Sequence, residues 1–419
     1  MRRLQTFCCC AVFSLAACHD FGRFWEDPAG QVPDTTTPSF AGLTIVIPAG
    51  TTMLKLRWSP AVDDRTPAEN VIYDIFQSST AGGQVYSSPT ATVTGITEFL
   101  ITGLAPGSTR FFVVRARDAA GNKELNTTER SAMTFATGDA WTTITNVPAP
   151  SSGRAPARSV GHPNGYAYIM GGGNCGYGIF YTNNDRYDPS TDSYTAMSNM
   201  PGTIDADPAL GTNGKIYLNP GDVFTEYDPA LDTYTAKAAM PVTMMCGYNT
   251  IGANDGRIFV FGGQAPGCTG YTNNVQAFDP RTNSWAVLTP SPFTPAQTSY
   301  QITAWGDKIF IFGGFNGSYL TTAWMYDTKT DTTVPRAALP VAAANVFAVT
   351  GANEKIYVVG PGFNYEYNPV TDSYTARAAF PLGSGYNVRG VFATNGKIYT
   401  FGADNGSCAV QNSYAYTPP

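Results

Sequence analysis

Charged side chains, histidine and long apolar runs are all scarce in this chain of 419 residues. Charged residues make up 13% of it, about half of the usual share in globular proteins. A helix needs about 20 apolar residues to cross a bilayer, and no such run occurs, so we expect no transmembrane helix in the mature form. The formal net charge is −6. Because an acidic surface repels phosphate backbones, we expect no nucleic-acid partner.

The chain also lacks any long segment with helical hydrophobic spacing. Short alternating apolar segments fill it instead, separated by turns, and it holds 43 glycines, 30 prolines and 24 tyrosines. This pattern predicts an all-β protein. Because a single core seldom grows beyond about 250–300 residues, the length favours two domains.

The N-terminus has the features of an export signal. Residues 1–17 combine a positive start with a short apolar segment, which is too short for a membrane helix. The closing Leu15-Ala16-Ala17-Cys18 resembles the lipobox of bacterial lipoproteins. The resemblance implies cleavage before Cys18 and attachment to the membrane through lipid on its thiol. An ordinary secretory signal is the alternative. We expect a protein anchored in the bacterial cell envelope, with the outer membrane or the cell surface favoured.

The next segments predict a tether and a first domain. Residues 18–38 hold prolines, threonines and scattered charges, which favour an extended chain. Residues 39–138 show about seven short strands, as in a sandwich of two sheets. They resemble the fibronectin type III family in four core residues: Trp58, Tyr73, Leu104 and Phe112. We interpret the turn at Asp63-Asp64 as a solvated loop, with calcium binding as the alternative.

Residues 139–419 are repetitive, with a period of about 40–50 residues that matches one four-stranded propeller blade. Six segments share a polar turn followed by an apolar-aromatic strand that ends, in most repeats, at glycine. These strands begin at Tyr166, Lys215, Arg257, Lys308, Lys355 and Lys397. An aromatic residue with a turn pair follows each of them: Tyr187, Tyr227, Phe278, Tyr326, Tyr367 and Tyr416.

This pattern resembles the kelch family, which has paired glycines, a Tyr-Asp-Pro turn and an outer Trp or Tyr. The resemblance implies an all-β chain in which a six-bladed kelch-like β-propeller follows the immunoglobulin-like sandwich. We expect the glycines where only a residue without Cβ fits. The last repeat lacks its outer strand, and residues 141–145 carry the aromatic residue, Trp141, that such a strand needs. We therefore expect this N-terminal strand to close the sixth blade.

Four cysteines remain in the mature chain besides Cys18. An even number in an exported chain favours disulfides. The expected pairs are Cys246–Cys268 within the third blade and Cys175–Cys408 between the first and the sixth. A metal site is the alternative, but no close pair of Cys or His supports it, and we predict neither a metal nor another cofactor.

The start of each innermost strand is expected at the mouth of the central channel, where propellers commonly bind ligands. Counting back equally from the residue that opens the next strand gives one residue in each blade: Arg158, Asp207, Asn249, Tyr300, Phe347 and Arg389. All of them except Phe347 are candidate ligand-binding residues. The alternative is that they only plug the channel. The loops on this face are rich in Gly, Tyr, Asn and Thr, which suits a glycan.

No recognisable catalytic constellation accompanies these residues. A copper site of the galactose oxidase kind needs two histidines, and His162, interpreted as a strand residue, is the only one in the repeats. Sialidase Asp boxes are absent. A kelch-type sialic acid mutarotase is closer in architecture, and Asp205 with Asp207 could form a carboxylate pair. We predict a binding protein for a glycan or a protein. An exported carbohydrate-active enzyme and a structural envelope component are the alternatives.

Overall fold

The computed structural model describes eleven stretches of the chain: residues 33–148, 157–174, 179–204, 206–220, 223–243, 247–265, 269–289, 300–344, 346–383, 389–404 and 411–419. Within these stretches the chain is all-β apart from one 3-10 helix, Ala68–Asn70. None of their helices is long and apolar enough to cross a membrane. The signal segment, every cysteine and Asp205 lie outside the described residues, so their predicted roles remain predictions.

Two antiparallel sheets formed by strands β1 to β7 make up what we call the two-sheet unit. The first sheet has the order β1-β2-β5, with strands Leu43–Pro48, Leu54–Trp58 and Glu98–Ile101. The second has the order β4-β3-β6-β7, with strands Ala91–Thr94, Ile72–Ser78, Thr109–Arg117 and Arg130–Met133. One apolar cluster joins the two sheets, and it contains the four predicted core residues Trp58, Tyr73, Leu104 and Phe112. Each sheet therefore gives one face to a shared core.

Six further antiparallel sheets have four strands each. The first sheet is β9-β10-β13-β14 (Arg158–Gly161, Ala167–Met170, Asn184–Asp188, Ser193–Met197), and the second is β15-β16-β17-β18 (Ala209–Leu210, Ile216–Leu218, Thr225–Asp228, Thr233–Ala236). The third is β19-β20-β23-β24 (Asn249–Gly252, Ile258–Phe261, Val275–Asp279, Ser284–Val287), and the fourth is β25-β26-β27-β28 (Gln301–Trp305, Lys308–Phe312, Ala323–Asp327, Thr332–Arg336). The fifth is β29-β30-β31-β32 (Phe347–Thr350, Ile356–Gly360, Phe363–Asn368, Ser373–Ala376). The sixth is β33-β34-β35-β8 (Gly390–Phe392, Ile398–Asp404, Gln411–Thr417, Ala140–Ile144).

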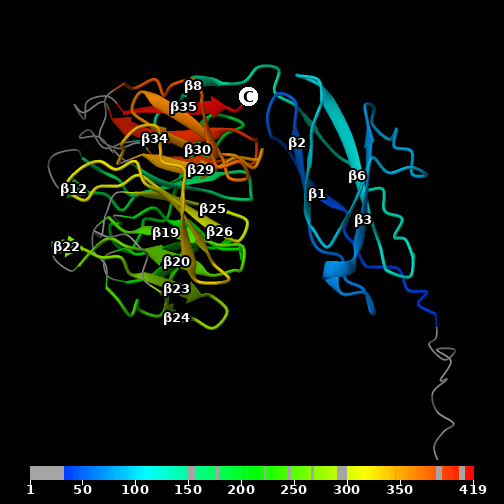
Figure 1. The fold of residues 1–419 in the computed structure, drawn as a ribbon, viewed down its shortest axis with the longest axis horizontal. Coiled ribbons are helices and arrows are strands. Elements are labelled where there is room, and N and C mark those ends of the chain that lie inside the picture. Colours follow the sequence, from blue (N-terminus) through cyan, green and yellow to red (C-terminus); the bar gives the residue numbers. More distant parts are fainter. Residues whose placement is uncertain are drawn as a thin grey trace, which may run out of the picture.

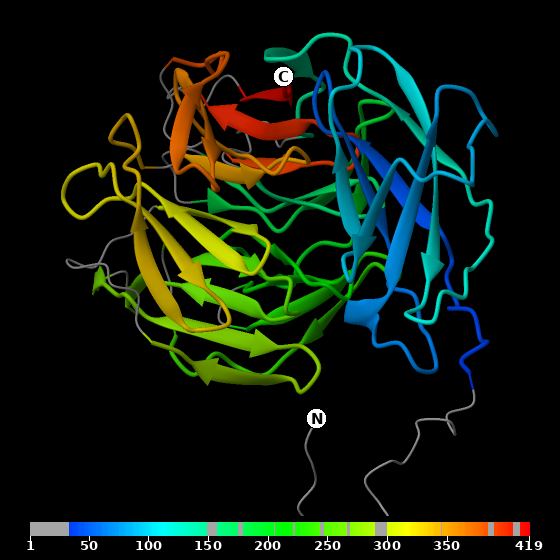
Figure 2. The ribbon, with the colours of Figure 1, turned by 45° about the vertical axis from the view of Figure 1, so that its right-hand side comes forward.

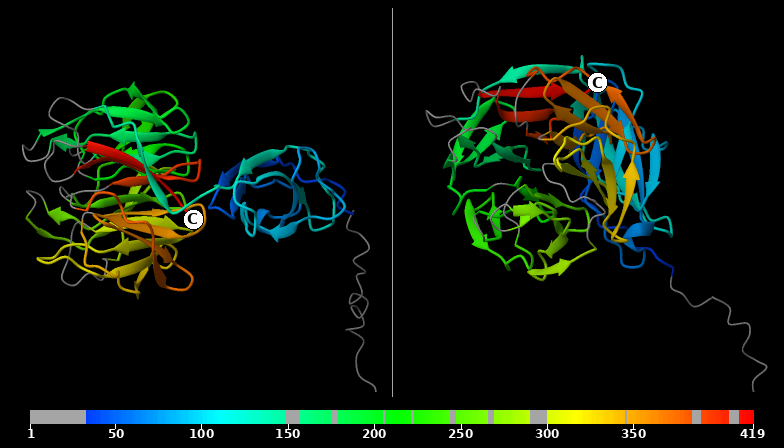
Figure 3. Two further views of the ribbon diagram at one scale, coloured as in Figure 1. Left: turned by 90° about the horizontal axis from the view of Figure 1, so that it is seen from above. Right: turned by 60° about the vertical axis from the view of Figure 1, so that its left-hand side comes forward.

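The six sheets follow one another around a common centre and form a β-propeller (Figure 1, Figure 3). Their innermost strands contact one another in the order β9, β15, β19, β25, β29, β33 and back to β9. The outermost strand of the sixth sheet is β8, which comes before the first sheet in the chain, and its Trp141 pairs with Tyr416 of β35.

The β-propeller has two different faces. The connections from the second to the third strand of each sheet lie on one side, which we call the loop face. Two of them contain the small hairpins β11-β12 (Gly173–Asn174, Ile179–Phe180) and β21-β22 (Gln264–Ala265, Thr269–Tyr271). The tight turns between the first and second strands lie on the other side, the turn face. The two-sheet unit is packed beside the turn face, and β12 and β22 point away from it (Figure 1, Figure 2).

Glycine ends several second strands because the backbone there adopts a left-handed conformation. Gly171, Gly262 and Gly313 have φ values of 64°, 55° and 65°, a region that side chains with Cβ seldom enter. Space is also short, since a Cβ on Gly262 would lie 2.0 Å from the hydroxyl oxygen of Tyr300. Backbone conformation and lack of space therefore both favour a residue without Cβ, as expected.

A hydrogen bond between a tyrosine and an aspartate five residues later recurs in the sheets. The hydroxyl of Tyr227 donates to the carboxylate of Asp232 at 2.7 Å. The same carboxylate accepts the backbone N–H of Ser198, at the end of the preceding sheet, at 3.0 Å. Equivalent Tyr–Asp pairs are Tyr187–Asp192, Tyr326–Asp331 and Tyr367–Asp372. Each pair thus ties one sheet to its neighbour.

Candidate functional site

A cavity of about 330 Å³ lies between the innermost strands of the six sheets. Residues of all six innermost strands line it, and apolar ones such as Val160, Leu210 and Ile251 make up much of its wall. Polar side chains interrupt this wall, and they include Asp207, Asn249, Gln301 and Thr303. A hydroxylated ligand would find both donors and acceptors in such a lining.

The loop-face end of the cavity holds a cluster of three charged residues, Arg158, Asp207 and Arg389. Nη1 of Arg158 lies 3.8 Å from Oδ1 of Asp207, and Nε of Arg389 lies 3.4 Å from Oδ2 of the same carboxylate. The side chains of Arg158 and Arg389 are only 11% and 8% exposed, and that of Asp207 is 23% exposed. These charges interact more strongly than they would in water, because little solvent screens them.

Local structure explains why three residues far apart in the sequence meet. Arg158 begins β9 of the first sheet and pairs with Met170. Asp207 comes just before β15 of the second sheet, and Arg389 comes just before β33 of the sixth. Each residue therefore enters its innermost strand at the loop face, and the contacts of β9 with β15 and β33 bring the three together. Arg389 is also held by a hydrogen bond from its Nη1 to the carbonyl oxygen of Val346, at 3.2 Å.

The other candidate residues are placed differently. Asn249 lines the cavity, and its side-chain amide donates to the carbonyl oxygen of Tyr300 at 3.0 Å. Tyr300 itself is fully buried in the apolar cluster between the third and fourth sheets, and burial raises the pKa of its hydroxyl well above the ordinary value. Its neighbour Gln301 lines the cavity instead, and so does Phe347.

The position of Tyr300 follows from a shorter turn in the fourth sheet. In the third sheet Ala253 and Arg257 close a turn with three residues between them, whereas in the fourth sheet Trp305 pairs with Lys308 across two. Counting back from Lys308 by the same number of residues as in the other sheets therefore reaches Tyr300. The residue equivalent to Asn249 is the next one, Gln301. Ser159 and Thr303 also line the cavity and were missed, because the count selects only one residue in each strand.

His162 follows β9 and belongs to the turn after it, which differs from the strand position that we expected. Its Nε2 lies 2.9 Å from the carbonyl oxygen of Gly214, in the equivalent turn of the second sheet. Its Nδ1 accepts the backbone N–H of Asn164 at 3.1 Å. With both ring nitrogens engaged in this way, the side chain joins two turns, and it lies away from the charged cluster.

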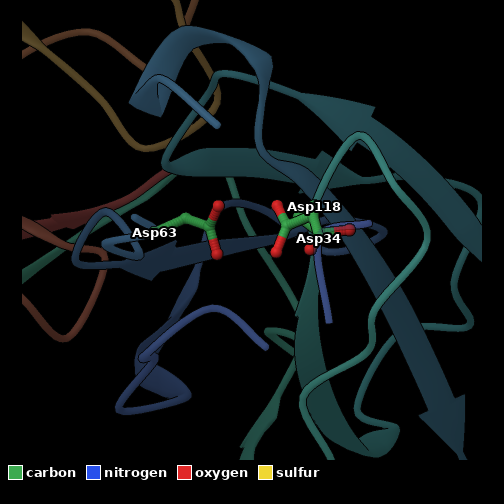
Figure 4. Close-up of side chains that lie close together, drawn as sticks. All are labelled: Asp34, Asp63 and Asp118. Carbon is green, nitrogen blue, oxygen red and sulfur yellow. The ribbon is translucent and has the colours of Figure 1, made fainter. Parts of the chain in front are cut away.

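The described part of the chain contains one group of three or more side chains that could hold a metal ion. The carboxylates of Asp34, Asp63 and Asp118 have oxygens within 4.8 Å of one another in the two-sheet unit (Figure 4). Asp118 is buried and accepts hydrogen bonds from both the backbone and the side-chain amide of Asn122, each at 2.7 Å. Burial raises the pKa of Asp118, but these hydrogen bonds outweigh it and hold the pKa below its ordinary value.

This cluster differs in part from the solvated loop that we expected at Asp63-Asp64. Asp64 is exposed, but Asp63 is half-buried and faces the two other carboxylates. Oδ2 of Asp63 accepts the backbone N–H of Thr66 at 2.8 Å. Asp34 and Asp118 are too distant in the sequence for their spacing to have indicated this arrangement.

Comparison with known proteins identifies the repeats. The family described as the KLHDC2/KLHL20/DRC7 Kelch-repeats domain matches residues 232–373. Kelch-like protein 35 of Mus musculus is 28% identical over 225 residues, which are 52% of this chain and 38% of that protein. Exoglucanase B of Cellulomonas fimi is 32% identical over 142 residues, which are 34% of this chain and 12% of that protein. The chain thus spans only a minor part of either relative.

Two solved structures are similar over most of the chain. A fungal alcohol oxidase of the AA5 family, in complex with copper, has a TM-score of 0.48 and 16% identity and covers 67% of this chain and 76% of its own. YjhT has a TM-score of 0.48 and 14% identity and covers 64% of this chain and 95% of its own. Together with the matched repeats, the six four-stranded sheets lead to one conclusion: this chain contains kelch repeats that fold as a β-propeller.

Proposed function

We propose that the chain is a lipid-anchored binding protein of the bacterial cell envelope, with a fibronectin type III-like domain and a closed six-bladed propeller. The cyclic contacts of the innermost strands and the pairing of β8 with β35 support closure. The two sheets around Trp58 and Tyr73 support the fibronectin-like assignment. We take the domain boundaries from the sequence, with the signal at 1–17, the tether at 18–38, the sandwich at 39–138 and the propeller at 139–419.

The membrane anchor rests on the sequence alone. Lipid on Cys18 would hold the mature chain to the bilayer, and the tether would separate the bilayer from the folded domains. Metabolic labelling with a radioactive fatty acid tests this. The intact chain takes up label, and a Cys18→Ser variant does not; label on the variant would contradict the anchor.

The ligand of the loop face is a glycan or a protein, and the charged cluster at Asp207 is the observation that carries this proposal. Two nearly buried guanidinium groups approach one carboxylate at the end of a polar cavity. A guanidinium group donates strong, directional hydrogen bonds to hydroxyl and carboxylate oxygens, and a carboxylate accepts them from hydroxyl groups. Such a cluster therefore recognises an oxygen-rich ligand.

A glycan array tests this function, with the intact chain and two variants applied in parallel. We expect at least one glycan to bind and the Asp207→Asn variant to lose it, because the amide presents one acceptor oxygen instead of two. Arg281→Ala is the control, since that arginine is 73% exposed on an outer turn. Binding that survives in Asp207→Asn would contradict this site. If no glycan binds, cross-linking at the loop face in intact cells tests for a protein ligand, and the absence of any cross-linked partner leaves a structural envelope component.

A carbohydrate-active enzyme of the mutarotase or sialidase kind is the second candidate. One observation favours it: Asp207 is a carboxylate at the end of a cavity, flanked by two arginines, as an acid–base residue would be. The exoglucanase among the relatives is matched over only 12% of its length. Incubation of a bound glycan with the protein, followed by analysis of the sugar, distinguishes the two candidates, because only the enzyme changes it.

A further inference from the structure

The outer face of the sheet β1-β2-β5 has an apolar part that is covered by the β-propeller, beside the half-exposed pair Arg57 and Glu98. Ile47, Lys55 and Leu100 lie opposite one another on the three strands and so share this face. Ile47 and Ala49 are buried against Ala352 of the β-propeller, and Leu100 and Phe392 pack around them. The sheet therefore buries one face in the core of the two-sheet unit and part of the other against the turn face of the β-propeller.

One buried cation lies in this contact. The side chain of Lys55 is 5% exposed, and its ammonium lies 2.9 Å from Oε1 of Glu98 in the same sheet. The ammonium also forms an ion pair with Glu354 of the β-propeller. Burial raises the pKa of Glu98, but Lys55 and Arg57 together hold it below its ordinary value. A lysine at so little exposure is stable only when it is paired.

Glu354 occupies a backbone position that the other sheets fill with glycine. Five sheets have the same turn between their first and second strands, closed by a backbone hydrogen bond such as Gly256 N–H to Ala253 O. The residue that donates this bond has positive φ in all five: Gly165, Gly214, Gly256, Glu354 and Gly396. Glu354 is the exception, with a φ of 62°. A left-handed conformation is unfavourable for glutamate, so another interaction offsets its cost.

The equivalent turn of the sixth sheet requires a residue without a side chain at this position. Gly396, at the same position in the sixth sheet, faces the carbonyl oxygen of Pro48, and a Cβ there would lie 2.0 Å from that oxygen. The two-sheet unit thus contacts two neighbouring turns. At the same position, the first turn carries a carboxylate and the second carries glycine. Among the turns of this form, that order occurs only at the fifth and sixth sheets.

We infer that Glu354 and Gly396 select the one position on the β-propeller at which the two-sheet unit docks, and that Lys55 recognises Glu354. A ring of similar sheets offers several similar turns, and an apolar contact alone would not distinguish them. Docking at this position holds the two-sheet unit and the β-propeller in one fixed arrangement. It covers turns of the fifth and sixth sheets and leaves the loop face directed away from the two-sheet unit (Figure 1).

Small-angle scattering and calorimetry of the full chain test this inference. We expect the wild type to scatter as one compact particle and to unfold in one transition. Lys55→Glu places three carboxylates together, so the radius of gyration rises and a second transition appears. Adding Glu354→Lys restores the opposite charges and reverses both changes. Arg57→Glu is the matched control, because Arg57 is on the same strand, half-exposed and paired only with Glu98 among the ion pairs described.

Three outcomes would overturn the inference: unchanged scattering in Lys55→Glu, an equal change in Arg57→Glu, or no recovery in the charge-swapped pair. Glu354→Gly covers the case in which Lys55→Glu fails to fold, because glycine suits the turn and the two-sheet unit is untouched. That variant must also give the larger particle, and a compact one would overturn the inference.

Discussion

The hydroxyl of Tyr416 donates a hydrogen bond of 2.7 Å to the carboxylate of Asp139, which lies 277 residues earlier in the chain. In other sheets the aspartate comes five residues after its tyrosine, as in Tyr227 and Asp232. Asp139 also accepts the backbone N–H of Ala378, at the end of the fifth sheet, at 2.7 Å. The sixth sheet therefore has the same tyrosine–aspartate pair as the first, second, fourth and fifth sheets, which we call the latch, but here two distant segments supply it.

Substitution of Asp139 removes this latch and should weaken the pairing of β8 with β35. We expect Asp139→Ala to lower the free energy of unfolding by about 2–3 kcal/mol, because charged hydrogen bonds contribute about 1.5–3 kcal/mol and alanine also disfavours the positive φ of 56° at this position. Chemical denaturation measures the loss.

The third sheet supplies a control for this prediction, since it has Phe278 and Asn283 where the others have tyrosine and aspartate. The double variant Tyr416→Phe and Asp139→Asn copies that pair and should lose less stability than Asp139→Ala. An equal or larger loss in the double variant would contradict the role given to the latch.

The latch aspartates also predict sensitivity to acid. Burial raises the pKa of Asp232, Asp331 and Asp372, but hydrogen bonds from tyrosine hydroxyls and backbone N–H groups hold each pKa below its ordinary value. Their folded pKa is thus lower than their unfolded pKa of about 3.9, so their contribution is present above pH 4 and is lost as the pH falls through the folded pKa. The free energy of unfolding should decline below about pH 4, and less steeply in an Asp232→Asn variant. Equal slopes would exclude this cause.

The packing of Gly262 predicts a large cost for one methyl group. A Cβ there would meet the hydroxyl of buried Tyr300, so Gly262→Ala should destabilise the chain by more than about 2 kcal/mol. Gly270 is the matched position, because its φ of 66° is also positive but no atom lies within 4 Å of its Cβ direction. Gly270→Ala should cost only about 1 kcal/mol. Thermal unfolding of both variants measures the difference, and similar losses would show that only the backbone conformation matters.

The left-handed backbone at Glu354 predicts that Glu354→Gly changes the free energy of unfolding in opposite directions with and without Lys55. In the wild-type chain, Glu354→Gly removes a partner of nearly buried Lys55 and should lower the free energy of unfolding. In a Lys55→Met background that partner is already absent, and the same substitution should raise stability by about 1 kcal/mol by relieving the left-handed glutamate. Urea unfolding of the four chains gives both values. A loss of stability in both backgrounds would refute the compensation.

The repeating elements were predictable because their signals are local. Paired glycines, the Tyr-Asp turn and alternating apolar residues report backbone conformation and burial within a few positions, and the strands lie where these signals put them. Trp141 indicated the outer strand of the sixth sheet because the last repeat lacks that strand and Trp141 is the aromatic residue that it needs. The four core residues around Trp58 were expected from the resemblance to the fibronectin type III family, and they share one apolar cluster.

The candidate site was only partly predictable, because it depends on turn lengths and on contacts between distant segments. One residue fewer in the fourth turn moved Gln301 into the position expected for Tyr300. The Arg158, Asp207 and Arg389 cluster was expected at the channel mouth, but which carboxylate pairs with which arginine depends on geometry that one sequence does not contain. The contact of Lys55 with Glu354 joins residues 299 positions apart, and no local pattern indicates it.

Strand β8 precedes the first sheet in the chain but belongs to the sixth, so the sixth sheet forms only after the C-terminal strand β35 has been made. Thr142 donates a hydrogen bond to the carbonyl oxygen of Ala415, which is synthesised 273 residues later, so β8 has no partner strand until β35 has been made. Until then the sixth sheet lacks its outer strand, and its edge can pair with other chains. A truncation of the last few residues would therefore free both ends at once, so aggregation of newly made chains would be its first visible effect.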